Sequence, residues 1–107
     1  MQQISAPELA RLIAEPGPDG VQLLDVREDW EYEIAHLPGS THLPMQRVPA
    51  ELGRLDPTRP LVCICHHGVR SMQVAMFLSH RGFDRIMNLD GGIDAWSRQV
   101  DPNCTAY

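Results

Sequence analysis

The residues best suited to chemistry lie in the segment "CICHHGVRSM", residues 63–72. Cys65 ends a run of β-forming residues, and two histidines, Gly68 and Arg70 follow it before a helical pattern begins. A strand-to-helix turn does not require cysteine or arginine, but a site that holds an anionic group against a sulfur does. A loop at a helix start directs several backbone N–H groups into one cavity, and the helix dipole adds about half a positive charge. We therefore expect Cys65 to be a nucleophile that ionises more readily than a free thiol.

The other residues of this loop have supporting parts in this prediction. Gly68 allows backbone conformations that other residues resist. Arg70 supplies a permanent cation at the helix start, where it opposes the dipole. Because this placement disfavours the helix, we infer that Arg70 interacts with a group in the loop. His66 and His67 could act as general acids or could simply offer backbone N–H groups, and we favour the second interpretation.

The elements that position the loop follow from hydrophobic spacing and capping signals. Ser5 and Glu8 form a capping box before a helical pattern, and "VQLLDV" at 21–26 is typical of a strand buried on both faces. A short helix or helical turn is predicted over 27–36, and further helices over 47–55, 69–83 and 93–100. A turn with a brief strand is predicted over 37–44, a buried strand over 61–65, and a last strand with its turn over 85–92. In the helix at 69–83 we expect Met72, Ala75, Met76 and Leu78 to face inward.

Strands that alternate with helices predict an α/β fold with a mostly parallel central sheet and helices on both faces. We expect one domain over residues 1–107. In such sheets ligands bind beyond the carboxyl ends of the strands, which is where Cys65 falls.

Charge and hydropathy exclude several classes of function. The formal net charge is −5, and the nine basic residues are all arginines, scattered from Arg11 to Arg98. Nucleic-acid binding depends on clustered cations, so we expect no nucleic-acid partner. No apolar run approaches the roughly 20 residues that span a bilayer, and the N-terminus does not resemble a signal peptide. We expect a cytoplasmic protein without a membrane partner.

The three cysteines are an odd number, which argues against a disulfide framework. Cys63, inside the strand, is predicted to be an inert core thiol, and Cys104 is either a bystander, which we favour, or a thiol that resolves a Cys65 intermediate. A zinc site formed by the two strand cysteines with His66 and His67 is disfavoured, because adjacent histidines after a strand would not converge with them on one tetrahedron. We expect no metal and no cofactor.

Three motifs in order along the chain resemble the single-domain rhodaneses, which belong to the rhodanese-like sulfurtransferase family. "LLDVREDWEYEIAHLPGSTHLP" at 23–44 resembles that family's first signature, "CHHGVRS" at 65–71 its active-site loop, and "LDGGIDAW" at 89–96 its closing Gly-Gly motif. The match covers almost the whole chain, so it is more specific than any single motif.

The resemblance implies a rhodanese-like fold and a sulfurtransferase activity in which Cys65 carries a persulfide. The sulfur donor would be thiosulfate or a persulfide, and the acceptor a thiol or a protein. The outer sulfur would be surrounded by the backbone N–H groups of six loop residues: His66, His67, Gly68, Val69, Arg70 and Ser71. Arg70 would also help to bind an anionic donor, and Asp25 and Arg27 would form a supporting ion pair.

Four residues outside the loop carry weaker expectations. Ala35 occupies a position where the family usually has glycine, which would cost about 1 kcal/mol if the backbone φ were positive. Cys104 lies where the family has no fixed thiol. His36 and Trp96 are expected to be packing residues, His36 with a hydrogen bond that holds its turn.

Two alternatives remain open. A cysteine phosphatase or arsenate reductase uses a related loop, but with one residue more than the four that separate Cys65 from Arg70. The shorter loop suits a single outer sulfur better than the three equatorial oxygens of a phosphate. A non-catalytic rhodanese-like regulatory module is the second alternative, although such modules often lack the cysteine.

Overall fold

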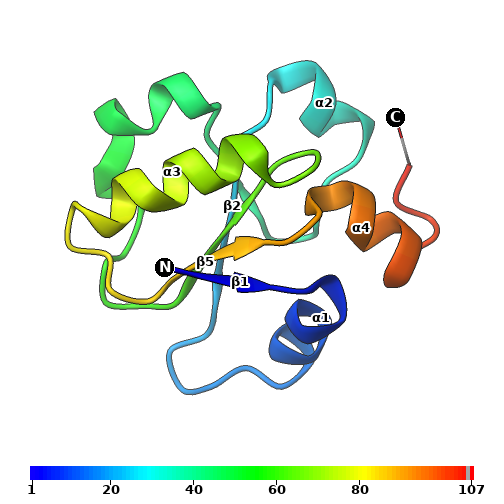
Figure 1. Ribbon diagram of the computed structural model, residues 1–107, viewed down its shortest axis with the longest axis horizontal. Helices are drawn as coiled ribbons and strands as arrows, with labels where there is room; N and C mark the ends of the chain where they lie inside the picture. The colour runs from blue at the N-terminus through cyan, green and yellow to red at the C-terminus, as the bar shows by residue number, and fades with distance from the viewer. Residues whose placement is uncertain (106) are drawn as a thin grey trace.

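The computed structural model of the chain describes residues 1–105 and 107. Its centre is a five-stranded, all-parallel sheet with the strand order β1-β5-β4-β2-β3 (Figure 1). The strands are β1 (Gln2–Ile4), β2 (Gln22–Asp25), β3 (Thr41–His42), β4 (Leu61–Ile64) and β5 (Ile86–Leu89). The helices are α1 (Ala6–Ala14), α2 (Asp29–Ile34), α3 (Val69–Ser79) and α4 (Gly92–Gln99), with two 3-10 helices, η1 (Met45–Arg47) and η2 (Pro49–Arg54). The predicted α/β class and parallel sheet are confirmed.

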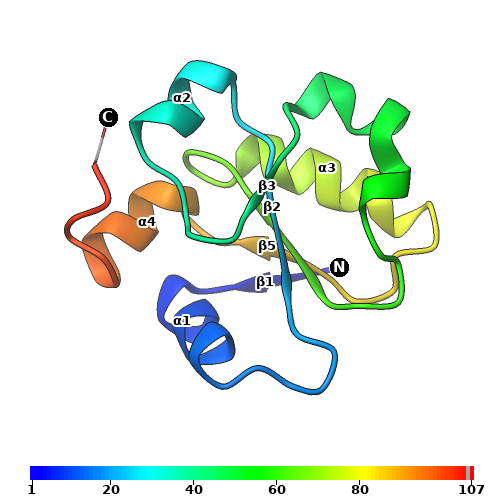
Figure 2. The ribbon, with the colours of Figure 1, turned by 180° about the vertical axis from the view of Figure 1, so that it is seen from behind.

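Two layers of helices cover the two faces of the sheet (Figures 1 and 2). On one face, α3 and the 3-10 helices pack over a cluster that contains Leu61, Cys63 and Cys65. On the other face, α1 and α4 pack over a cluster that contains Val62 and Ile64. Successive residues of a strand point to opposite faces, so β4 is apolar along its whole length because both of its faces are buried.

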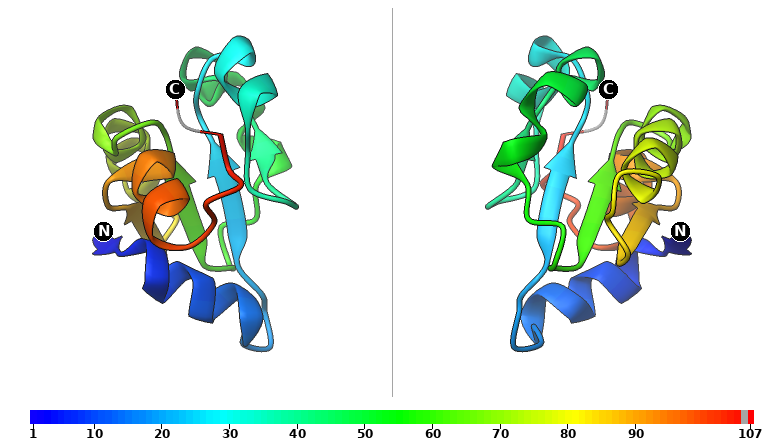
Figure 3. Two further views of the ribbon diagram at one scale, coloured as in Figure 1. Left: turned by 90° about the vertical axis from the view of Figure 1, so that its right-hand side faces the viewer. Right: turned by 90° about the vertical axis from the view of Figure 1, so that its left-hand side faces the viewer.

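The central strand β4 delivers Cys65 to the carboxyl edge of the sheet. β4 pairs with β2 and β5, and Cys63 lies in register with Leu24 on one side and Asn88 on the other. Helix α2 lies beyond the carboxyl end of β2, at the same edge of the sheet (Figure 3). The residues after β2, β4 and β5 therefore meet in one region.

Helix α3 is rotated differently from the sequence prediction. Its buried residues are Ser71, Val74, Ala75 and Leu78, whereas Met76 is 51% exposed, so its predicted inward position is wrong. At about 100° per residue, Met76 lies about 140° around the helix from Ser71. Because Ser71 packs beneath the loop, Met76 must point outward.

The segment predicted as a short helix at 47–55 forms η1 and η2 instead, with a non-helical residue, Glu51, inside η2. Prolines at 44 and 49 remove backbone donors there, which favours short turns over a continuous α-helix. Over the described part of the chain, the helices are all too short or too polar to cross a membrane.

Candidate active site

Cys65 lies directly after β4 and is buried, with 1% of its surface exposed. Its Sγ accepts a hydrogen bond from the backbone N–H of Gly68 at 3.1 Å. Gly68 has a φ of +103°, which an L side chain rarely adopts, and it is the N-cap of α3. The loop thus turns at the one residue that can turn this way, and that turn aims an amide at the sulfur. A cradle formed by the remaining loop amides around an outer sulfur stays a prediction.

Ser71, in the first turn of α3, contacts the same sulfur. Its Oγ lies 3.3 Å from Cys65 Sγ and also donates a hydrogen bond to Oδ1 of Asn88, on β5. The Asn88 Nδ2 donates in turn to the carbonyl of Gly68 at 3.1 Å. Sequence reasoning missed Asn88, because its position inside a predicted strand gave no sign of a polar role.

Helix α4 holds the loop from the other side. The backbone N–H of Ile93 donates to the Cys65 carbonyl at 2.8 Å, and that of Asp94 donates to the His66 carbonyl at 3.1 Å. Gly92 permits this approach: its φ is +61°, and a Cβ there would lie 2.4 Å from both carbonyl oxygens. The second glycine of "LDGG" is therefore required because the loop backbone passes directly over it.

Arg70 points to helix α2. Its two Nη atoms donate to the two carboxylate oxygens of Glu31, at 2.6 and 2.9 Å. The Arg70 hydrogen bond lowers the pKa of Glu31 to about 2 despite the burial of this carboxyl, so Glu31 is ionised at neutral pH. The inference that Arg70 interacts with a group in the loop is therefore wrong: its partner is a carboxylate on α2, which sequence reasoning did not single out. The part of Arg70 in donor binding stays a prediction.

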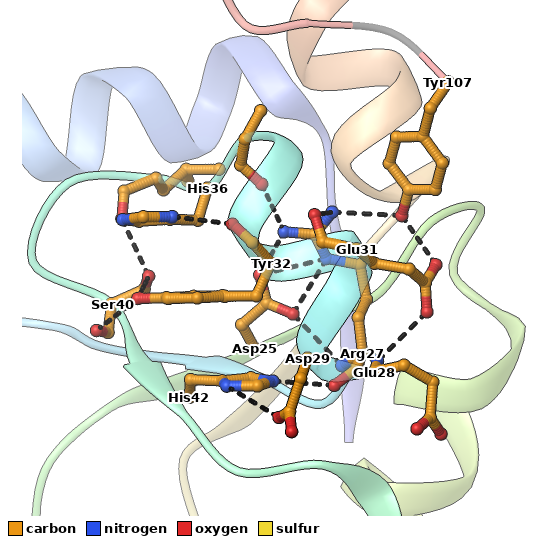
Figure 4. Close-up of polar contacts among 12 residues, drawn as sticks. Asp25, Arg27, Glu28, Asp29, Glu31, Tyr32, His36, Ser40, His42 and Tyr107 are labelled. Carbon is orange, nitrogen blue, oxygen red and sulfur yellow. Dashed lines mark hydrogen bonds and ion pairs between the residues drawn. The ribbon is translucent and has the colours of Figure 1, made fainter.

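Tyr107 joins this pair to the loop. Its hydroxyl donates to Glu31 Oε2 at 2.7 Å and accepts from Arg27 Nη1 at 3.0 Å (Figure 4). Its ring stacks on His66 at 4.1 Å between centroids, with an interplanar angle of 13°. Burial raises the pKa of Tyr107 to about 12, so the hydroxyl keeps its proton. Nothing in the sequence indicated that this residue reaches the loop.

Asp25 and Arg27 form a fully buried ion pair with an N–O distance of 2.7 Å. Arg27 also donates to the backbone carbonyls of Glu31 at 3.2 Å and Ala35 at 2.6 Å. It thereby ties the end of β2 to the middle and to the C-cap of α2, the helix that carries the partner of Arg70. The pair exists as expected from the sequence, and its supporting role for catalysis stays a prediction.

The turn after α2 differs in one respect from expectation. Ala35 has a φ of −167°, which is extended backbone, so alanine carries no conformational penalty there. His36 Nδ1 donates to the Tyr32 carbonyl at 2.9 Å, and the Tyr32 ring lies stacked between His36 and His42 (Figure 4). His36 is thus a packing residue that holds its turn, and Trp96 is 7% exposed in the core on the α4 side.

One group of side chains beside the loop has metal-ligating atoms. His66, His67 and Asp94 place such atoms within 4.8 Å of one another. The two imidazole rings are stacked at 4.1 Å with an interplanar angle of 20°, so their lone pairs lie in nearly parallel planes and do not converge on one point. Asp94 also pairs with Arg98 at 3.3 Å. The geometry favours ring stacking, and the expectation that no metal is needed stays a prediction.

The other two cysteines are separated from the site. Cys63 is fully buried, and burial strongly raises the pKa of its thiol, as suits an inert core residue. Cys104 is buried in the cluster on the α4 face, whereas Cys65 belongs to the cluster on the α3 face. A disulfide between Cys65 and Cys104 would require the chain to rearrange, which favours the interpretation of Cys104 as a bystander.

Known proteins share this sequence and fold. A family model, the rhodanese-like domain, matches residues 5–99. The thiosulfate sulfurtransferase GlpE of Pseudomonas paraeruginosa (strain DSM 24068 / PA7) is 36% identical over 101 residues, covering 94% of this chain and 88% of that protein. The chloroplastic rhodanese-like/PpiC domain-containing protein 12 of Arabidopsis thaliana is 42% identical over 93 residues, covering 83% of this chain and 31% of that protein's length.

A solved structure agrees with the sequence match. The rhodanese-like domain protein from Staphylococcus aureus superposes with a TM-score of 0.85 at 30% identity, covering 100% of this chain and 99% of that one. The resemblance found in the three sequence motifs is confirmed, since the matched residues 5–99 include all three. This chain belongs to the rhodanese-like domain family.

Proposed function

We propose that this protein is a sulfurtransferase that moves sulfane sulfur from thiosulfate or a persulfide donor to a thiol or protein acceptor through a persulfide on Cys65. The observation that carries the proposal is the position of Cys65 Sγ at the carboxyl edge of the sheet, 3.1 Å from the Gly68 amide. The 36% identity to a thiosulfate sulfurtransferase supports it.

The reaction has two half-reactions. In the first, the Cys65 thiolate attacks the outer sulfur of the donor. A bond forms between Sγ and that sulfur, the donor's sulfur–sulfur bond breaks, and its electron pair leaves with sulfite or with a thiolate. In the second, the acceptor thiolate attacks the outer sulfur of the persulfide, the Cys65 Sγ–S bond breaks, and the Cys65 thiolate returns.

The first test treats the purified protein with thiosulfate and measures the intact mass. We expect a gain of one sulfur atom, located on Cys65 by peptide mapping and removed by dithiothreitol. We expect no appreciable release of phosphate from p-nitrophenyl phosphate, because the loop is one residue shorter than a phosphatase loop. Robust phosphate release would favour the phosphatase alternative, and the absence of any sulfur adduct from thiosulfate or a persulfide donor would favour a non-catalytic module.

The Arg70–Glu31 pair bears on the class of donor. Thiosulfate is a dianion and would have to compete with a carboxylate that already engages both Nη atoms of Arg70. A persulfide donor presents less charge and does not need this cation. We therefore propose that the natural donor is a protein or small-molecule persulfide.

Replacing Glu31 by glutamine should change donor preference. With the carboxylate charge removed, Arg70 is released toward an anionic donor, so kcat/KM for thiosulfate should rise several-fold relative to that for a persulfide donor. Its dependence on ionic strength should also increase. Steady-state kinetics with both donors measure this ratio, which partial unfolding leaves unchanged. Glu51→Gln is the matched control, because Glu51 also pairs with arginines but lies in η2. An unaltered ratio in Glu31→Gln would contradict the assigned role of Arg70.

A further inference from the structure

Asn88 lies on β5 beneath the active-site loop and is 1% exposed. Its Nδ2 donates to the Gly68 carbonyl and to Gln3 Oε1, each at 3.1 Å, and its Oδ1 faces Ser71 Oγ. A backbone carbonyl can only accept, so the Gly68 carbonyl decides which way the Asn88 amide points. The Ser71 hydroxyl must therefore donate its hydrogen bond to Asn88 Oδ1.

The Ser71 hydroxyl has one proton to donate and two neighbouring acceptors. While it donates to Asn88 Oδ1, only the lone pairs of Ser71 Oγ face Cys65 Sγ, which is 3.3 Å away. A Cys65 thiol can donate its own proton to that oxygen, but a thiolate cannot. Ser71 stabilises the thiolate only if its hydroxyl rotates toward the sulfur, and that rotation leaves the buried Asn88 Oδ1 without this donor.

We propose that Asn88 is a positioning residue that competes with the Cys65 thiolate for the hydroxyl proton of Ser71. The inference rests on the proposed function, in which Cys65 is the nucleophile. Asn88 acts through Ser71 and through Gly68, whose carbonyl it holds while the Gly68 N–H donates to the sulfur. Asn88 thereby withholds one hydrogen bond from the thiolate.

This competition has a consequence for the first half-reaction. The nucleophilicity of a thiolate rises as it becomes more basic, with a Brønsted coefficient of about 0.4–0.5. A thiolate denied the Ser71 proton is thus less abundant below its titration midpoint but more reactive. Once the persulfide forms, Sγ carries no charge, and the Ser71 hydroxyl can again donate its hydrogen bond to Asn88 Oδ1. Asn88 therefore favours the persulfide over the free thiolate.

The charged and titratable groups in and around the loop come from β2, α2, β4, the loop, α3, α4 and the C-terminal residue, and substitutions at Asn88 and Ser71 leave all of them in place. They are Asp25, Arg27, Glu31, Cys63, His66, His67, Arg70, Asp94 and Tyr107. A comparison among Asn88 and Ser71 variants therefore isolates the hydroxyl.

The test is a double-substitution cycle in a Cys63→Ala, Cys104→Ser background, where Cys65 is the one thiol left. The thiolate is titrated by its ultraviolet absorbance in the parent, Asn88→Ala, Ser71→Ala and the double variant, with Cys65→Ser as the blank. Asn88→Ala also removes the bond to Gly68, but that loss has the same effect whether or not the Ser71 hydroxyl is present. We therefore compare the rise in thiolate fraction that Asn88→Ala causes in the two backgrounds. Below the titration midpoint this rise should be about tenfold larger with Ser71 intact than in the Ser71→Ala background.

The pH profile of persulfide formation gives a second readout. In Asn88→Ala the acidic limb should move to lower pH, and the plateau rate should fall about threefold. A purely structural role would lower the rate at every pH without moving the limb.

Equal titration shifts with Ser71 intact and in the Ser71→Ala background would overturn the proposal. The titration needs no sulfur donor, so it tests Asn88 even if persulfide never forms, in which case the proposed function fails separately. If Asn88→Ala does not fold, Asn88→Leu removes the acceptor while keeping side-chain volume, and the same comparison applies.

Discussion

Replacing Cys65 by serine is expected to abolish sulfur transfer and the one-sulfur mass gain while leaving the fold intact. A serine hydroxyl does not ionise near neutral pH, so it cannot attack a sulfane sulfur as a thiolate does. Serine has nearly the shape of cysteine and can accept from the Gly68 amide and bond with Ser71, the two groups that contact Sγ. The unfolding free energy should therefore change by less than about 1 kcal/mol.

The matched controls are the other two thiols. Cys63→Ala should lose about 1–2 kcal/mol of stability, because it leaves a small cavity in the core, yet retain most of the activity. Cys104→Ser should also retain most activity, because Cys104 packs on the opposite face of the sheet. Thermal unfolding and transfer from thiosulfate to cyanide measure the two effects. Transfer that persists in Cys65→Ser would refute the whole assignment.

Replacing Gly92 by alanine should have the largest effect on stability. The new Cβ would lie 2.4 Å from the carbonyl oxygens of Cys65 and His66, which are backbone atoms that cannot rotate away. The positive φ adds about 1–2 kcal/mol of strain. Displacement would also weaken the bonds from Ile93 and Asp94 to the same carbonyls. We expect a total loss of about 3 kcal/mol or more, seen as a fall of roughly 15 °C in Tm.

The same substitution should reduce transfer beyond what unfolding explains. The two carbonyls belong to the first peptides of the loop, so moving them moves Cys65 relative to the Gly68 amide. Activity measured well below the unfolding midpoint should fall at least tenfold. Gly17→Ala is the control, because a Cβ at Gly17 would meet nothing within 4 Å and its backbone is not left-handed. A Gly92→Ala protein as stable and active as Gly17→Ala would show that the loop does not depend on this close approach.

Three long-range contacts explain why the loop has a defined shape on its helical side. Glu31 holds Arg70 from α2, and Tyr107 holds both Glu31 and the ring of His66. Tyr107 lies outside the part of the chain that matches the family model, residues 5–99. The contacts of Tyr107 therefore come from a segment that the three motifs of the sequence did not include.

The sequence by itself determined the class of fold and the position of the candidate nucleophile, Cys65, at the edge of the sheet. Apolar runs such as 61–65 set strands buried on both faces, and a cysteine directly after the central strand must lie at the carboxyl edge of a parallel sheet. Gly68, at the start of the following helix, could be recognised because a positive φ requires glycine and is a local property of the chain. These predictions held because they depend on residues close together in sequence.

Only the tertiary structure decided which side chains meet around Cys65. Arg70 and Glu31 are 39 residues apart, Ser71 and Asn88 are 17 apart, and Tyr107 and Glu31 are 76 apart. Such pairs depend on the register of strands and on the rotation of α3, and hydrophobic periodicity left that rotation undecided, as the outward position of Met76 demonstrates. A residue's type states which bonds it can form, but packing of the whole chain decides which partner comes within hydrogen-bonding distance. For that reason the position of Cys65 followed from the sequence, whereas its contact with Ser71, the bond from Ser71 to Asn88 and the Arg70–Glu31 pair did not.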